Sequence, residues 1–465
     1  MFGLDLGLAL LLIACLLAAC IFEFINGFHD TANAVATVIY TKSLKPRTAV
    51  IWSGVWNFLG VYFGGLAVAM GIINLLPLQA LVDQNVYNNI AMVSSLILTA
   101  VIWNFGTWYL GIPCSSSHTL LGSIFGVGIA FIITSPTPVE LNWNKIIDAG
   151  LSLLVSPMIG FMITIFLMYI FHKIIRKKKF FHSADEHKKP PFWIRGILVL
   201  TCTSVSYSHG SNDGQKGIGL IMIILISILP TQFALNSTKN PANMIGSVND
   251  IEWYLNKANK KKMLPKDTIA VYKAQVNIGA IKKILNIIQT PDVDTKKYSF
   301  ELRKNILSLA SLTPTITTCK SNLDEKEIHK LKSNIKELKA YTEFAPLWAI
   351  LMVSISLGLG TMFGWKRIVV TIGEKIGKTH LNYAQGASAE IVAASTIQLS
   401  TLLGLPVSTT HVLSSGVAGS MVYEGGLKNL QSKTVKNILL TWLITIPVTV
   451  TLSGGLFLLF KYFIK

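Results

Sequence analysis

Long apolar stretches recur along almost the whole chain, separated by short polar loops and by one long polar segment. A helix needs about 20 apolar residues to cross the hydrocarbon of a bilayer, and stretches of roughly that size dominate this sequence. The clearest apolar stretches are Leu6–Ile25, Ala49–Leu76, Ile90–Leu110, Ile147–Phe171, Gly196–Tyr207, Ile218–Leu229, Phe344–Trp365, Tyr383–Leu403 and Ile438–Phe460. The pattern predicts an all-α polytopic membrane protein with about ten spans plus re-entrant segments.

Composition supports this prediction. Hydrophobic residues make up 51% of the chain and charged residues 14%, with a mean hydropathy of +0.52, whereas a soluble globular chain carries about 25% charged residues. The net charge of +18 does not indicate a nucleic-acid partner, because the basic residues lie in loops between apolar runs rather than in a basic motif. The expected surroundings are therefore a lipid bilayer.

The charged residues are concentrated between residues 231 and 343, which hold 19 basic and 11 acidic residues. We expect five segments: a first membrane repeat (1–175), a basic cytoplasmic linker (176–195), the start of a second repeat (196–230), a polar, mostly helical insertion (231–343) and the rest of the second repeat (344–465). The positive-inside rule places the basic loop in the cytoplasm and the N-terminus outside. The insertion then comes out on the external side.

Two short motifs occur twice, which indicates an internal duplication. Asp30 in Gly-Phe-His-Asp-Thr-Ala-Asn-Ala pairs with Asp213 in Gly-Ser-Asn-Asp-Gly-Gln-Lys-Gly at an offset of 183 residues. Gly-Ile-Pro-Cys-Ser-Ser-Ser-His, which ends at His118, pairs with Gly-Leu-Pro-Val-Ser-Thr-Thr-His, which ends at His411, at an offset of 293. Deleting the 113-residue insertion brings both pairs into nearly one register. With an odd number of spans each, the two repeats are inverted, and broken helices are expected to meet at a central substrate site.

Three hydroxyl residues follow a proline in each copy of the second motif. They are Ser115, Ser116 and Ser117 in the first copy and Ser408, Thr409 and Thr410 in the second. Proline suits the first turn of a helix, and serine or threonine suits its cap. A helix N-terminus offers unpaired amides and a positive dipole end, so two such ends can enclose a tetrahedral oxyanion. Ordinary helix capping is the alternative interpretation.

Acidic residues beside an anion site need an explanation. Asp30 and Asp213 would repel a dianion in a medium of low dielectric constant unless each is neutralised. We therefore expect these two carboxylates to bind the coupling proton or cation before the anion enters. His29 and His209 are candidate proton carriers, with hydrogen bonding in the core as the alternative. The neighbouring side chains expected to supply amide oxygens to the cation or donors to the anion are Asn33, Asn212, Gln215 and Lys216.

Other protein classes find no support in the sequence. There is no G-x-x-x-x-G-K-[ST] loop, no G-x-S-x-G elbow and no H-E-x-x-H motif, so ATP-driven transport, a serine hydrolase and a metalloprotease are not indicated. We expect no enzymatic activity. An anion channel stays an alternative, because it needs a polar lining but no fixed cation stoichiometry.

The repeated motifs resemble those of the PiT family of inorganic phosphate transporters. The similarity rests on Ile25-Asn26 with the Asp30 motif, on Ser208-His-Gly-Ser-Asn-Asp-Gly-Gln-Lys-Gly217, and on the Pro-x-Ser-[ST]-[ST]-His pair. It is strongest to the bacterial low-affinity permeases. The resemblance implies an inner-membrane symporter of phosphate, coupled to protons or sodium and carrying the free anion or a divalent-metal phosphate complex, with no cofactor.

The resemblance also implies site residues. It assigns phosphate and cation binding to Asp30, Asn33, Asn212, Asp213, Ser115, Ser116, Ser117, Ser408, Thr409 and Thr410. The first motif has His29 before Asp30 where the family usually has asparagine, so the cation and any metal stay open. Related members that move sulfate keep a sulfate or other oxyanion carrier as the alternative, and a homodimer is left open.

Overall fold

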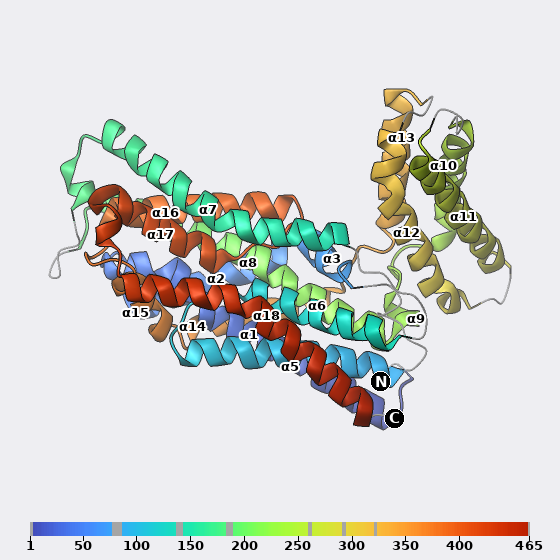
Figure 1. The fold of residues 1–465 in the computed structure, drawn as a ribbon, viewed down its shortest axis with the longest axis horizontal. Coiled ribbons are helices and arrows are strands. Elements are labelled where there is room, and N and C mark those ends of the chain that lie inside the picture. Colours follow the sequence, from blue (N-terminus) through green and yellow to red (C-terminus); the bar gives the residue numbers. More distant parts are fainter. Residues whose placement is uncertain are drawn as a thin grey trace. The chain divides into compact units, whose positions relative to one another are not determined.

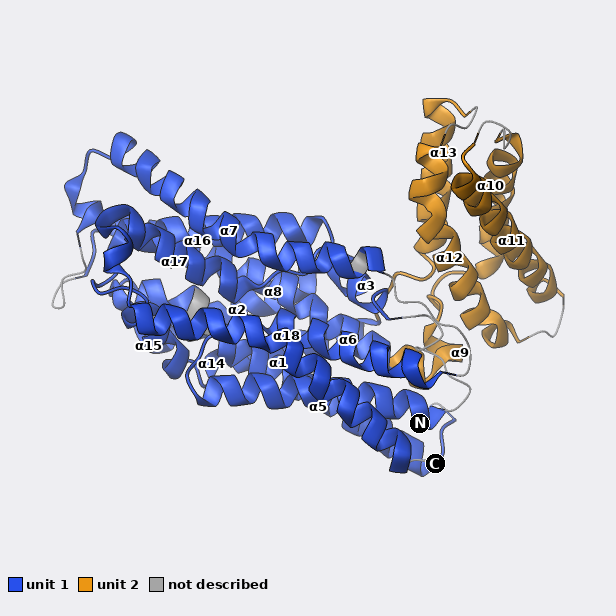
Figure 2. Ribbon diagram, in the orientation of Figure 1, with its two compact units in different colours: residues 1–224, 346–465 blue, residues 225–345 orange. Residues whose placement is uncertain are grey.

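The protein consists of helices that group into two compact units (Figure 2). The computed structural model describes residues 3–76, 86–135, 143–182, 189–258, 263–290, 294–319 and 323–463, and the side chains of residues 31–33 and 145 lie outside the described part. Unit 1 comprises Met1–Ile224 and Pro346–Lys465, and unit 2 comprises Leu225–Ala345. No strand occurs among the described residues, which confirms the all-α class.

The long apolar helices belong to unit 1 (Figure 1). The first repeat contains α1 (Leu6–Tyr40), α2 (Pro46–Phe63), α3 (Ala67–Ile73), α5 (Val86–Tyr109), α6 (Ser116–Thr134) and α7 (Trp143–Ile174). The second repeat contains α8 (Phe192–Ile228), whose last residues belong to unit 2, and then α14 (Leu347–Met362), α15 (Lys366–Glu374), α16 (Tyr383–Leu402), α17 (Thr409–Gly425) and α18 (Ser432–Phe463).

Several of these helices can cross a membrane. In the described ranges, α1, α5, α6, α7 and α18 are long and apolar enough, which makes five. Two further spans are formed by bent pairs, α2 with α3 at 70° and α14 with α15 at 64°, which gives up to seven. These bends lie outside the repeated motifs, at which breaks are expected. The hydroxyl motifs do separate α5 from α6 and α16 from α17, but the expectation of a break at the acidic motifs is wrong, because Asp30 and Asp213 lie inside the continuous helices α1 and α8. A number of about ten spans stays a prediction, because polar residues lower the hydropathy of α8 and α16.

The order of the helices follows the duplicated motifs. At an offset of 183 residues α1 corresponds to α8, and at 293 residues α5, α6 and α7 correspond to α16, α17 and α18. In Figure 1, α1 and α8 run in opposite directions through unit 1, and so do α7 and α18. Unit 1 is therefore the predicted pair of inverted repeats.

The two repeats interleave rather than pack as separate bodies. Helix α6 packs along α18 of the other repeat, and α17 packs along α7. Glycines allow these helices to approach closely. A Cβ atom on Gly126 of α6 would lie 2.1 Å from the carbonyl oxygen of Val450, and one on Gly419 of α17 would lie 2.5 Å from that of Phe161. Gly126 and Gly419 occupy equivalent positions in the repeats.

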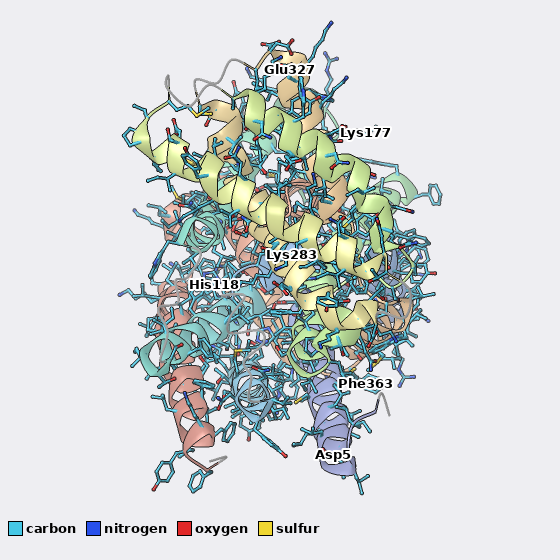
Figure 3. All side chains as sticks on the ribbon, turned by 90° about the vertical axis from the view of Figure 1, so that its right-hand side faces the viewer. Asp5, His118, Lys177, Lys283, Glu327 and Phe363 are labelled. Atoms are coloured by element: carbon cyan, nitrogen blue, oxygen red, sulfur yellow. The ribbon has the colours of Figure 1, made fainter. Side chains whose placement is uncertain are left out.

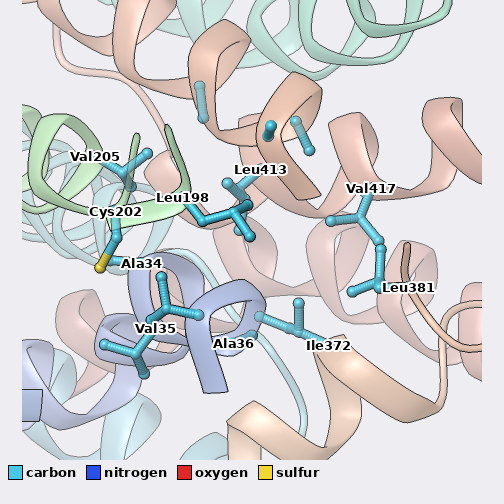
Figure 4. Packing of buried hydrophobic residues seen from close by; sticks show 14 of the residues in the cluster. Ala34, Val35, Ala36, Leu198, Cys202, Val205, Ile372, Leu381, Leu413 and Val417 are labelled. Carbon is cyan, nitrogen blue, oxygen red and sulfur yellow. The ribbon is translucent and has the colours of Figure 1, made fainter. Parts of the chain in front are cut away.

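A buried apolar cluster holds α1, α8 and α17 together (Figure 4). Val35 of α1, Leu198 of α8 and Leu413 of α17 are each at most 1% exposed. The same three helices carry Asp30, Asp213 and the second Ser-Thr-Thr motif, so the packing of this cluster fixes the relative positions of those polar residues.

Unit 2 is a small helical bundle with its own core. Its main helices are α10 (Ile245–Lys257), α11 (Pro265–Ile288), α12 (Ser299–Thr318) and α13 (Glu325–Lys339), preceded by the short α9 (Pro230–Phe233). Charged side chains such as Lys283 lie on its surface (Figure 3). Inside it, the fully buried Arg303 donates through Nη1 to the carbonyl oxygens of Ala234 at 3.0 Å and Thr342 at 2.8 Å. Arg303 thereby ties together the entry and the exit of this unit.

Candidate functional site

The two hydroxyl motifs begin equivalent helices, as predicted. Ser115 caps α6 by accepting a hydrogen bond from His118 N at 3.2 Å, and Ser408 caps α17 by accepting one from His411 N at 3.1 Å. Just before each proline, Gly111 (φ 68°) and Gly404 (φ 69°) adopt the left-handed conformation that glycine tolerates best. Each motif therefore turns the chain sharply and starts a new helix with its dipole toward the preceding turn.

The hydroxyl groups after these caps face two buried carboxylates. The Oγ atom of Ser116 lies 3.4 Å from Asp30 Oδ2 and 3.3 Å from Asp213 Oδ2, so one hydroxyl joins residues of both repeats. Thr409 donates to Asp213 Oδ2 at 3.4 Å, and Thr410 donates to Asp30 Oδ1. Asp30 and Asp213 are 2% and 0% exposed. The structure thus brings together the acidic motifs and the hydroxyl motifs.

His209 lies between the two carboxylates. Its Nε2 atom is 3.8 Å from Asp30 Oδ2 and 3.5 Å from Asp213 Oδ2. Its Nδ1 atom donates to Asn57 Oδ1 at 2.6 Å, while the amide of Asn57 is oriented by donation to the carbonyl oxygen of Ser53 at 3.0 Å. Because this contact fixes the proton on Nδ1, Nε2 faces the carboxylates either as a lone pair or as a second N–H group.

These three residues can hold a cation. One ligand atom each from Asp30, His209 and Asp213 lies within 4.8 Å of the other two, and all three residues are buried. Two carboxylates and an imidazole are a donor set that suits a divalent metal, and the carboxylates alone suit a proton or an alkali cation. Asn57 acts as the outer partner that orients the imidazole. The sequence analysis did not identify Asn57.

Lys216, which the sequence offers as a donor to the anion, also belongs to this cluster, where its ammonium group donates to oxygen atoms of the protein. The Nζ atom of Lys216 lies 2.6 Å from Asp213 Oδ1 and 3.1 Å from the carbonyl oxygen of Val407, and it also donates to Ser117 Oγ. Its side chain is 1% exposed. The hydroxyl of Ser117 in turn donates to the carbonyl oxygen of Val407 at 2.5 Å.

His29 is the remaining predicted side chain at the cluster. Its Nδ1 atom lies 3.7 Å from Asp30 Oδ1, and its Nε2 atom lies 3.3 Å from Thr107 Oγ1. It therefore links the first carboxylate to α5. Glu390, a buried acid outside this cluster, accepts hydrogen bonds from Thr37 and Thr201.

The predicted amide residues have other partners. Asn212 donates to Thr401 Oγ1 at 2.9 Å and accepts from Val407 N at 3.4 Å, which holds the turn before α17. Gln215 accepts from Val68 N and donates to the carbonyl oxygen of Gly64, both at 2.7 Å, so it spans the bend between α2 and α3. Both side chains position helix breaks. The side chain of Asn33 lies outside the described residues.

Comparisons with known proteins point in one direction. Residues 26–453 match the model of the phosphate transporter family. The chain is 41% identical to the low-affinity inorganic phosphate transporter PitA of Escherichia coli (strain K12), with 99% of each chain covered. It is 42% identical to the low-affinity inorganic phosphate transporter of Buchnera aphidicola subsp. Acyrthosiphon pisum (strain APS), with 97% of each chain covered. A solved structure, titled "The sodium-dependent phosphate transporter", has a similar fold, with a TM-score of 0.55 at 21% identity over 97% of this chain and 99% of that one.

Proposed function

We propose that this chain, which belongs to the phosphate transporter family, imports inorganic phosphate across the inner membrane as a secondary-active symporter coupled to a proton or another cation. The family consists of transporters rather than enzymes, in agreement with the missing catalytic motifs. The observation that carries the proposal is the arrangement of three hydroxyl groups at two equivalent helix starts, from Ser116, Thr409 and Thr410. All three face the same pair of carboxylates.

Electrostatics supports coupling to a cation. At a separation of about 5 Å and an effective dielectric constant of about 20, each pair of like unit charges repels by about 3 kcal/mol, so one uncompensated carboxylate opposes a dianion by about 6 kcal/mol. Lys216 compensates Asp213 at 2.6 Å, so Asp30 is the carboxylate that most needs a cation. A cation or proton at Asp30, His209 and Asp213 removes most of that repulsion. The cation therefore enters first, and the same three residues offer a place for the metal of a metal phosphate complex.

The hydroxyl groups can change their hydrogen-bond acceptor from a carboxylate to phosphate when phosphate binds. With the carboxylates charged, the hydroxyls of Ser116, Thr409 and Thr410 donate to them. Once a cation or proton has neutralised the carboxylates, these hydroxyls can rotate and donate to phosphate oxygens, together with the first-turn amides of α6 and α17. Both ligands are then bound where helices of the two inverted repeats meet, and a rearrangement of these interleaved helices exposes them alternately to the two sides of the membrane.

The test is phosphate counterflow in proteoliposomes. Vesicles that contain the purified protein are loaded with unlabelled phosphate and diluted into labelled phosphate at the same pH, with magnesium on both sides. A carrier accumulates label transiently, because internal phosphate exchanges for external phosphate. Equilibration without overshoot indicates a channel, and a protein that exchanges sulfate but not phosphate is a sulfate carrier. Repeating the uptake with an imposed proton, sodium or potassium gradient identifies the coupling ion.

A further inference from the structure

The ammonium group of Lys216 has the surroundings of a bound alkali cation. Its three oxygen partners are the carboxylate of Asp213, the hydroxyl of Ser117 and the carbonyl of Val407. Carboxylate, hydroxyl and carbonyl oxygens are the groups that bind hard cations in proteins. An ammonium group has three donors, and here each of them has an oxygen partner. Lys216 is therefore bound within the protein as a cation would be.

The partners of Lys216 come from both repeats. Asp213 and Val407 belong to the second repeat, and Ser117 belongs to the first turn of α6 in the first repeat. The lysine therefore sits where the two helix starts and one acidic motif meet. The Oδ1 atom of Asp213 faces Lys216. Its Oδ2 atom faces Ser116, Thr409 and His209.

The two acidic motifs differ in charge. At the repeat offset of 183 residues, the position equivalent to Lys216 is Asn33, a neutral residue. Asp213 is thus paired at 2.6 Å with a covalently attached cation. The neighbours that face Asp30 include the hydroxyl of Thr410 and the imidazole of His29. Compensation of the second carboxylate is built into the chain, whereas a mobile cation suits the first.

We propose that Lys216 is a fixed counter-cation that takes the place of a transported alkali ion at Asp213, so that phosphate exchange by this chain does not require sodium. The proposal rests on the phosphate carrier function argued above. It assigns to Lys216 a role in ion selectivity: the ammonium neutralises Asp213 during every cycle and is never released. The mobile ion that serves Asp30 and His209 is then a proton or a cation other than sodium.

Two variants separate the charge of Lys216 from its volume. Lys216→Ala removes the ammonium and leaves space beside Asp213 Oδ1, Ser117 Oγ and the carbonyl oxygen of Val407, where a sodium ion can bind. Lys216→Met removes the charge but keeps a side chain of similar length in that space. We expect phosphate counterflow of the unmodified chain to be equal in sodium chloride and choline chloride.

The expected effects are large. In choline chloride, counterflow by Lys216→Ala falls by roughly a hundredfold, because a buried carboxylate has lost its partner. Sodium chloride restores most of it, whereas Lys216→Met stays inactive in both salts. A second readout is thermal unfolding of the purified proteins in detergent. Sodium chloride raises the midpoint of Lys216→Ala relative to choline chloride at equal ionic strength, and it leaves the unmodified chain unchanged.

Several outcomes would overturn the proposal. One is an unmodified chain that exchanges phosphate in sodium chloride but not in choline chloride, an experiment that needs no variant. Others are full activity of Lys216→Ala in choline chloride, or a Lys216→Ala protein that unfolds at the normal temperature and gains neither activity nor stability from sodium. An unmodified chain that exchanges phosphate in neither salt would instead contradict the phosphate carrier function itself.

Discussion

The imidazole rings of His118 and His411 lie 4.5 Å apart, centroid to centroid, where the starts of α6 and α17 meet. Each ring belongs to the residue three positions after a capping serine, and His411 also stacks on Trp442 at 3.7 Å. This pair marks the contact between the two inverted repeats (His118 is labelled in Figure 3). The hydroxyl groups of both motifs are consequently close enough to serve one ligand.

Replacing either buried aspartate should abolish coupled transport. Asp30→Asn removes the charge that binds the mobile cation, and Asp213→Asn leaves the buried ammonium of Lys216 without its carboxylate, so we expect phosphate accumulation under an imposed ion gradient to fall by more than about a hundredfold in both variants. Asp148, which is exposed on α7, provides the matched control as Asp148→Asn and should transport normally. Uptake of labelled phosphate, with the amount of protein in the membrane measured in parallel, checks this. Undiminished accumulation by either variant would contradict the assigned role.

Ser116 should contribute to phosphate affinity. Its hydroxyl faces both carboxylates, and a hydrogen bond to a charged group contributes about 1.5–3 kcal/mol, so Ser116→Ala should raise the KM for phosphate by roughly ten- to a hundredfold. Ser123→Ala is the control, because the buried hydroxyl of Ser123 donates to the carbonyl oxygen of Thr119 in the same helix. Initial rates over a range of phosphate concentrations separate the two variants. Equal KM values would remove Ser116 from the binding site.

The close crossing of α6 and α18 should depend on glycine. In Gly126→Ala the new Cβ atom would lie 2.1 Å from the carbonyl oxygen of Val450, so the helices must move apart, and overpacking of this kind costs about 1–3 kcal/mol. The thermal midpoint in detergent should fall by several degrees. Gly455→Ala on α18 meets nothing within 4 Å and should unfold at the normal temperature. If both variants unfold alike, the crossing is not limited by this contact.

Arg303 should stabilise unit 2. Burial lowers the pKa of its guanidinium to about 10, so the group remains charged at neutral pH. Arg303→Met leaves the buried carbonyl groups of Ala234 and Thr342 without their donor, and we expect a loss of about 2–4 kcal/mol in the stability of this unit. Faster hydrogen exchange in α12 is the measurement, with Lys304→Ala at an exposed neighbouring position as the control. Unchanged exchange would show that the two hydrogen bonds contribute little.

Much of this arrangement could be predicted from the sequence because the chain is duplicated. The two Pro-x-Ser-[ST]-[ST]-His motifs predicted a capped helix start in each repeat, which the structure places at Ser115 and Ser408, and the repeat register predicted that α6 and α17 are equivalent. Asn57 could not be found in this way, because it lies in an apolar helix outside the repeated motifs, and its role depends on the packing of α2 against α8.

Gln215 shows the other limit of sequence analysis. Its position within an acidic motif suggested contact with the ligand, but its amide bonds to backbone groups at the bend between α2 and α3. Nothing in the local sequence around Gly64 fixes the direction of that bend. Lys216 was visible as a charged residue in the motif, yet its meaning depends on the carbonyl group of Val407, which is 191 residues away in the sequence.

The packing of α6 against a helix of the other repeat has a consequence for biosynthesis. Helix α6 finds its packing surface on α18, the last helix of the chain, and all of unit 2 is synthesised between them. During translation the first repeat is therefore in the bilayer before α18 exists, and the polar start of α6 lacks that packing partner until then. A ribosome that stalls within the insertion would leave an unfinished membrane domain in which α6 lacks its partner α18.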